Sequence, residues 1–116
     1  MPEKLVPILH VADAREASKW YARLGFSLEG EHRFAPTMPI YAFLVRGDNQ
    51  LHLSEHKGDA KPGTLTYFYV DDVDSIAEEF GEEVKEQPWG TREVWLTDAD
   101  GNRWRIGTPK PEKRAE

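Results

Sequence analysis

The feature that most constrains the fold of this 116-residue chain is a pattern that occurs twice. An apolar segment runs into an aspartate and then into a helical pattern, first at residues 9–13 and again at residues 69–72. Three further extended segments follow each helical pattern. No obvious residue-level repeat accompanies this recurrence. The chain is therefore predicted to hold two strand–helix–three-strand modules, an α+β arrangement.

The first module is expected over about residues 3–57. Its first strand is predicted at residues 5–11, where Pro7 places it at an edge or where a pairing partner is missing. Asp13 is expected to cap a helix over residues 14–24. The three following strands are predicted at residues 26–28, 40–45 and 50–54.

The second module is expected over about residues 63–109, after a polar linker. A strand is predicted at residues 64–70 and a helix at residues 73–80. The remaining strand candidates are residues 83–85, 93–97 and 103–107. Residues 1–109 are thus expected to form one domain, and the charged tail at residues 110–116 is expected to be disordered.

Composition narrows the partners of the chain. Its formal net charge of −6 provides no basic surface for nucleic acid or for an anionic membrane. No stretch approaches the roughly 20 apolar residues of a membrane span, and the start lacks the pattern of a secretory signal. A cytoplasmic protein is therefore expected. The absence of cysteine excludes disulfides, thiolate metal ligands and cysteine nucleophiles.

Residues 86–102, EQPWGTREVWLTDADGN, combine two turns with an alternating strand. Trp89 lies on the first turn, between Pro88 and Gly90, and the Asp/Gly/Asn chemistry of the second turn folds the chain back. An indole held beside a rigid hairpin suits stacking on a flat ligand, although an indole on a turn also serves ordinary packing.

Four motifs, in this order, resemble the vicinal-oxygen-chelate superfamily, which includes glyoxalase, extradiol dioxygenases and bleomycin-resistance proteins. They are PIL with AD at residues 7–9 and 12–13, WYARLGF at 20–26, YVDDVD at 69–74 and DADGN at 98–102. The resemblance extends over about residues 5–109. It implies two paired βαβββ modules whose curved mixed sheet forms a cup.

The resemblance also implies where a divalent metal would bind. Superfamily members that hold a metal carry ligands at positions that correspond here to Val6, Leu65 and Arg105, with a further position at His52. Two aliphatic side chains and a cation cannot ligate a divalent ion. The chain is therefore expected to resemble the metal-free branch, with no metal, no cofactor and no catalytic residues.

Within that branch, residues 86–93 resemble the bleomycin-resistance proteins. These are domain-swapped homodimers that bind a cationic glycopeptide drug in two interface grooves, where aromatic side chains stack on its bithiazole and acidic groups meet its cationic tail. The implied function is metal-independent sequestration of a small cationic aromatic ligand, such as a bleomycin-class antibiotic, by a homodimer. The residues that the resemblance carries over are Trp89 and Tyr67 as stacking platforms, Phe34 as a facing aromatic, Ser54 as a polar groove residue and Pro7 in exchange of the N-terminal strand.

Strand alternation gathers further candidates on the faces that would line the cup. These side chains are Val6, Ile8, His10, His52, Ser54, Leu65, Tyr67, Tyr69, Glu93, Trp95, Arg103 and Arg105. Such a face is more polar and aromatic than the core of a protein, so it indicates a binding surface. Trp95 belongs to this surface as well. Glu93 and Arg105 are expected to neutralise one another rather than to form a catalytic pair. His52 is expected to be a hydrogen-bonded groove residue.

Two other functions remain open at the level of sequence. One is a metal-dependent lyase or dioxygenase of the glyoxalase type, with a divergent site built from His52, Glu93 and His10. The other is an immunity-like or structural partner protein, in which the side chains of the cup itself would fill it. Trp89 has a corresponding second interpretation, which is packing across a dimer interface.

Overall fold

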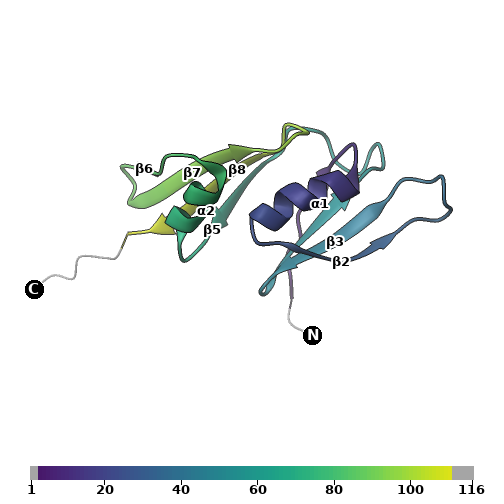
Figure 1. The fold of residues 1–116 in the computed structure, drawn as a ribbon, viewed down its shortest axis with the longest axis horizontal. Coiled ribbons are helices and arrows are strands. Elements are labelled where there is room, and N and C mark those ends of the chain that lie inside the picture. The colour runs from purple at the N-terminus through teal and green to yellow at the C-terminus, as the bar shows by residue number, and fades with distance from the viewer. Residues whose placement is uncertain (1–2, 111–116) are drawn as a thin grey trace, which may run out of the picture. The chain divides into compact units, whose positions relative to one another are not determined.

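The computed structural model describes residues 3–110, and its contacts divide the chain into two compact units (Figure 1). The first unit is Met1–Thr64 with Thr97–Asn102, and the second is Leu65–Leu96 with Arg103–Glu116. Within residues 3–110, each unit contains one four-stranded mixed sheet and one helix. The predicted α+β fold with two strand–helix–three-strand modules is confirmed. Residues 111–116, most of the predicted disordered tail, lie outside the described part.

The sheet of the first unit has the strand order β1-β4-β3-β2. Its elements are β1 (Ile8–His10), α1 (Ala14–Arg23), β2 (Ser27–His32), β3 (Tyr41–Arg46) and β4 (Asn49–Ser54). β1 pairs in parallel with β4 and lies at the edge of the sheet. Pro7 predicted this edge position. The predicted first strand was too long, because residue Leu5 is 98% exposed and the ladder begins only after Pro7. The strand predicted at residues 26–28 was too short.

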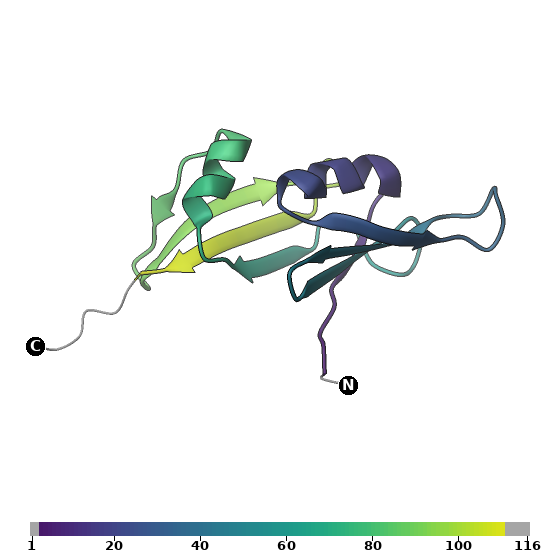
Figure 2. The ribbon, with the colours of Figure 1, turned by 60° about the horizontal axis from the view of Figure 1, so that its bottom comes forward.

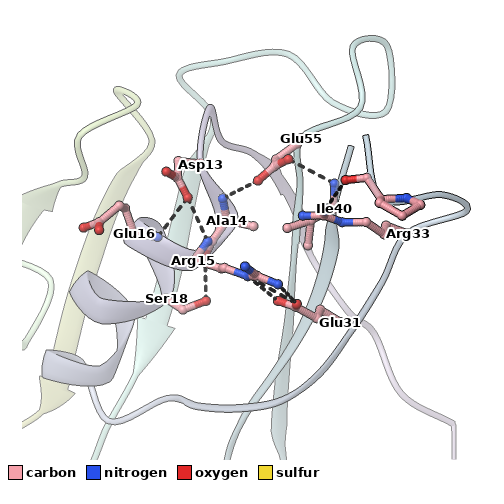
Figure 3. A network of polar contacts seen from close by, with 10 residues as sticks. Asp13, Ala14, Arg15, Glu16, Ser18, Glu31, Arg33, Ile40 and Glu55 are labelled. Atoms are coloured by element: carbon pink, nitrogen blue, oxygen red, sulfur yellow. Dashed lines mark hydrogen bonds and ion pairs between the residues drawn. The ribbon is translucent and has the colours of Figure 1, made fainter. Parts of the chain in front are cut away.

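Helix α1 begins where the sequence predicted, because the Asp13 side chain accepts hydrogen bonds from the backbone N–H groups of Arg15 and Glu16. A second carboxylate anchors the helix to the sheet. Glu55 accepts from the backbone N–H of Ala14 at 2.7 Å and from that of Ile40 at 3.0 Å, as Figure 3 shows. The helix is therefore joined at its first turn to the start of β3.

The Asp98–Asn102 turn belongs to the first unit, although it connects two strands of the second. Asp98 accepts hydrogen bonds from the backbone N–H groups of Asp100 and Asn102, and its other oxygen accepts from the buried Tyr21 hydroxyl at 2.6 Å. The Asn102 side chain donates to the carbonyl of His10. The Asp/Gly/Asn motif therefore closes the predicted hairpin and also satisfies polar groups of the first unit.

The sheet of the second unit has the strand order β5-β8-β7-β6. Its elements are β5 (Leu65–Tyr69), α2 (Val73–Phe80), β6 (Lys85–Glu86), β7 (Thr91–Thr97) and β8 (Arg103–Pro109). Helix α2 lies over one face of this sheet (Figure 2). On the face opposite the predicted cup residues, Val94, Leu96, Trp104 and Ile106 are buried, while Thr66 and Phe68 of β5 are half-buried. Within residues 3–110 no helix is long and apolar enough to cross a membrane.

Candidate ligand-binding site

The face of the second sheet opposite its buried residues is aromatic and open. Trp89 is 61% exposed and Trp95 is 55% exposed, while Tyr67 on β5 is 37% exposed. Leu65 and Tyr69, which alternate with half-buried positions on β5, are exposed as well. Strand alternation predicted Leu65, Tyr67, Tyr69 and Trp95 on this face, whereas Trp89 was predicted from its turn motif. An exposed apolar face of this kind is typical of a site for a ligand or partner.

A single buried carboxylate organises this aromatic face. Glu93 on β7 is 1% exposed. Its Oε2 accepts from the Tyr67 hydroxyl at 2.5 Å, the Thr91 hydroxyl at 2.8 Å and the Trp89 indole N–H at 3.2 Å. Its Oε1 accepts from the Trp95 indole N–H at 3.0 Å. Two exposed indoles and one exposed phenol are thereby held by one side chain.

The carboxylate of Glu93 stays ionised at neutral pH although it forms no ion pair with any cation of residues 3–110. Burial raises its pKa, but the hydrogen bonds that it accepts, with the one from Tyr67 foremost, lower that pKa by more, so the pKa lies below its ordinary value. The pKa of Tyr67 is raised by burial and by the hydrogen bond to Glu93. At neutral pH the phenol therefore keeps the proton that it donates.

Gly107 on β8 leaves the space that this arrangement needs. A Cβ at that position would lie 2.5 Å from the Tyr67 hydroxyl oxygen and 3.2 Å from the Cγ of Glu93. Contacts at those distances would force one of the two side chains to move. The absence of a side chain at Gly107 is thus part of how the phenol reaches the carboxylate.

The expected ion pair between Glu93 and Arg105 is not formed. The Arg105 guanidinium lies over the Trp95 ring, 4.5 Å from its centroid, in a cation–π contact. Ion pairs among residues 3–110 include neither Arg105 nor Arg103. The prediction was wrong because neutral donors on β5, on β7 and in the turn before β7 saturate the carboxylate.

The first sheet carries a second aromatic cluster. His52 on β4 contacts the rings of Tyr41 and Phe43, and its Nδ1 is 2.9 Å from the Tyr41 hydroxyl oxygen. Burial lowers the pKa of His52, which favours the neutral ring at physiological pH. His52 is thus a hydrogen-bonded side chain on an aromatic face. Phe43 and Ile8 are the exposed large apolar residues beside it.

Three other predicted site residues lie in different surroundings. Ser54 is fully buried and donates to Asp59 at 2.7 Å, so its hydroxyl does not face solvent. Phe34 is on the loop after β2, where its exposed ring packs edge-on against His32. Pro7 precedes β1, and its carbonyl accepts from the backbone N–H of His52.

The divergent metal site has no support within either unit. Taking each unit by itself, no three His, Asp or Glu side chains of residues 3–110 gather as ligands for a metal ion. His10 and His52 belong to the first unit and Glu93 to the second. The oxygens of Glu93 are already occupied by its four donors.

Four contributing residues were missed from the sequence. Thr91 and Gly107 lie two positions from predicted residues on the same strands, and Tyr41 occupies the alternating position beside Phe43. Period-two spacing could have included all three. Asp59 lies in the polar linker, where no periodic pattern identifies a partner for Ser54.

A family comparison decides the classification of the chain. Residues 1–112 match a family model described as a glyoxalase superfamily protein. The chain belongs to the glyoxalase superfamily. The resemblance recognised from the four motifs is thereby confirmed. A search of curated protein sequences finds no match for this glyoxalase superfamily protein.

Solved structures share the fold of this glyoxalase superfamily protein over nearly its whole length. A bleomycin-binding protein complexed with bleomycin has a TM-score of 0.72 and 22% identity, covering 94% of this chain and 100% of that chain. A bleomycin resistance determinant encoded on the transposon Tn5 has a TM-score of 0.74 and 21% identity, covering 95% and 100%. TnmS3, an antibiotic binding protein from Streptomyces sp. CB03234, has a TM-score of 0.76 and 23% identity, covering 95% and 98%. At these identities the likeness concerns the fold.

Proposed function

We propose that this glyoxalase superfamily protein binds and sequesters a flat aromatic small molecule of the antibiotic type, without catalysis. The observation that carries the proposal is the aromatic face of the second unit, where Glu93 holds the indoles of Trp89 and Trp95 by their N–H groups. A hydrogen-bonded indole exposes its flat face while its polar atom is satisfied. Such a ring can stack on a planar ligand with little further loss of side-chain freedom.

The class of ligand is supported by the structural neighbours. Three proteins of the same fold are described as binding bleomycin, conferring bleomycin resistance or binding an antibiotic. We propose that binding here needs no metal ion, because Val6, Leu65 and Arg105 stand at the positions that the superfamily resemblance implies for metal ligands, and none of them offers a suitable donor.

We also propose that the protein acts as a homodimer. Large apolar side chains are exposed on the sheets of both units, including Ile8 and Phe43 on the first and Trp95 on the second. Exposed apolar faces favour association. β1 pairs with β4 of its own unit, so an exchange of the N-terminal strand at Pro7 would replace this ladder with an identical one in the partner. Light scattering after size-exclusion chromatography would reveal a monomer if this proposal is wrong.

Isothermal titration calorimetry with metal-free bleomycin and a panel of planar antibiotics, in buffer containing EDTA, tests the binding function. Saturable binding by at least one member is expected, with a Trp89→Ala variant binding at least about tenfold more weakly. Met38→Ala is the matched control, because it removes an exposed apolar side chain from a loop of the first unit.

Two results would count against sequestration. No heat with any planar ligand would remove the binding function. Turnover or binding that is lost in EDTA and restored by a divalent metal would instead favour a metal-dependent enzyme of the glyoxalase type.

A further inference from the structure

We infer that the aromatic face of the second unit selects planar aromatic ligands that carry an acidic group. The inference rests on the proposed binding function and goes beyond it, because it specifies the charge of the ligand. It also reverses the expectation of a cationic ligand. That expectation required an acidic side chain free to meet the ligand on this face.

The acidic side chain that the face holds is not free. Glu93 is buried and accepts four hydrogen bonds from its own surroundings. A ligand amine would have to displace at least one of those donors to reach the carboxylate. Displacing Tyr67 or an indole would leave a donor without its partner and would disturb the rings that the ligand needs.

The charges that do face outward are positive. Arg105 and Arg103 alternate on β8, in register with Tyr67 and Leu65 of β5, so all four side chains share this face. Lys85 on β6 is directly opposite Glu93 on β7 and therefore lies on the same face. Three cations thus accompany one saturated carboxylate.

The position of Arg105 suits recognition of an acid. β8 lies between β5 and β7 in the sheet, which places the guanidinium between the phenol of Tyr67 and the indole of Trp95. The Arg105 guanidinium carbon lies 4.5 Å from the centroid of the Trp95 ring, and within residues 3–110 Arg105 forms no ion pair. Its N–H groups can therefore donate to a ligand. A carboxylate accepts two such N–H groups in a bidentate pair.

A ligand that lies across β8 would therefore stack its rings on Trp95 or Tyr67 and set its acidic group at the edge of Arg105. Arg103 and Lys85 would add attraction that salt screens. A cationic ligand of the same shape would meet repulsion from all three side chains.

Three naphthalene probes of matched shape test the inference. They are 2-naphthoate, neutral 2-naphthalenemethanol and the 2-naphthylmethylammonium cation, each titrated into the full-length protein by calorimetry at low and high salt. The expected result is that naphthoate binds roughly tenfold more tightly than the ammonium probe, as one charged hydrogen-bonded contact implies. The preference should shrink as salt rises.

Arg105→Gln should abolish the preference for naphthoate over the neutral probe and the ammonium probe. The matched control is Arg92→Gln, which removes a guanidinium from the same sheet. Arg92 pairs with Asp74 of α2 at 2.6 Å, and its side chain points to the other face. It should keep the preference. If Arg105→Gln does not fold, two other measurements test the role of Arg105 in the preference for naphthoate. They are probe binding by Arg105→Lys and the salt titration of the natural protein.

The outcomes separate this inference from the proposed function. Equal binding of all three probes, or tighter binding of the ammonium probe, would overturn the inference and leave aromatic stacking in place. Failure of all three probes, together with failure of the antibiotic panel, would remove the proposed function itself. A preference for naphthoate that persists in Arg105→Gln would also overturn the assignment.

Discussion

Replacement of Glu93 by Gln removes the charge at the centre of the aromatic face and keeps the size of the side chain. The amide oxygen can take the place of Oε2, where it still accepts from Tyr67, Thr91 and Trp89. The amide nitrogen then faces the indole N–H of Trp95, and two donors cannot bond to each other. One hydrogen bond is therefore lost and three are weakened.

The expected loss of folding free energy is about 2 kcal/mol at neutral pH. A hydrogen bond to a charged group contributes roughly 1.5 to 3 kcal/mol and one between neutral groups about 1 kcal/mol. The loss summed over four bonds is partly offset, because the neutral amide costs less to bury than a carboxylate. The exposed Trp95 ring can also turn toward water, which limits the loss.

The effect should depend on pH in a defined direction. The pKa of Glu93 is depressed in the folded state from its ordinary value of 4.5. Its carboxylate therefore stabilises the fold fully above that ordinary pKa, and the contribution disappears as the pH falls through the folded pKa. The difference in stability between the natural protein and the Glu93→Gln variant should thus narrow in strongly acidic buffer.

Urea denaturation at pH 7 and at pH 3, followed by tryptophan fluorescence, measures both effects of Glu93→Gln. Nuclear magnetic resonance adds a local readout, because the indole N–H signals of Trp89 and Trp95 should move together in the variant. Glu83→Gln, on an exposed glutamate, is the control. A loss below about 0.5 kcal/mol at pH 7, with both indole signals unmoved, would refute the role assigned to the carboxylate.

Three further changes test other parts of the structure. Gly107→Ala should destabilise the protein by about 1 to 3 kcal/mol in urea denaturation and weaken ligand binding, because the new Cβ would displace the Tyr67 hydroxyl. Tyr21→Phe should lower the free energy of unfolding by roughly 1.5 to 3 kcal/mol, since it removes one of the buried hydrogen bonds that Asp98 accepts. Burial lowers the folded-state pKa of His52, so the contribution of the neutral ring to folding stability is complete above the ordinary pKa of histidine and is lost as the pH falls. In urea denaturation at a series of pH values, His52→Gln should therefore lose less stability on acidification than the natural protein.

Each of these changes has a matched control in the same chain. Gly30→Ala adds a Cβ that meets nothing within 4 Å, so it should leave stability nearly unchanged. Tyr69→Phe removes an exposed hydroxyl, and His32→Gln removes an exposed histidine. If a control lowers the free energy of unfolding as much as the variant with which it is matched, the loss reflects the residue type rather than the contact.

The local signals in the sequence predicted the elements well. Asp13 caps α1 and the Asp98–Asn102 motif makes the predicted turn, because capping and turn formation involve only neighbours along the chain. Alternation on β7 and β8 also placed Trp95 and Arg105 correctly on the aromatic face, since it depends only on the period of a strand. The length of β1 was wrong because the extent of a strand depends on the partner that pairs with it.

The contacts within the site were harder to predict. Glu93 was assigned to the correct face but to the wrong partner, because charge alone suggested Arg105. Its actual partners come from β5, from the turn before β7 and from β7 itself, and Gly107 leaves the space in which Tyr67 reaches it. The Ser54 hydroxyl donates a hydrogen bond to Asp59, which lies in a segment without any periodic pattern.

By itself, the sequence determined the two-module order, the helix and turn boundaries and the face to which each strand residue belongs, because each of these follows from short-range backbone chemistry and from side-chain period. Only the tertiary structure decided which side chains meet on that face. Glu93 accepts hydrogen bonds from four neutral donors, and Arg105 lies over the Trp95 ring. The physical reason is that hydrogen bonds have a short range, so a partner is chosen by packing distances between strands that the linear chain does not record.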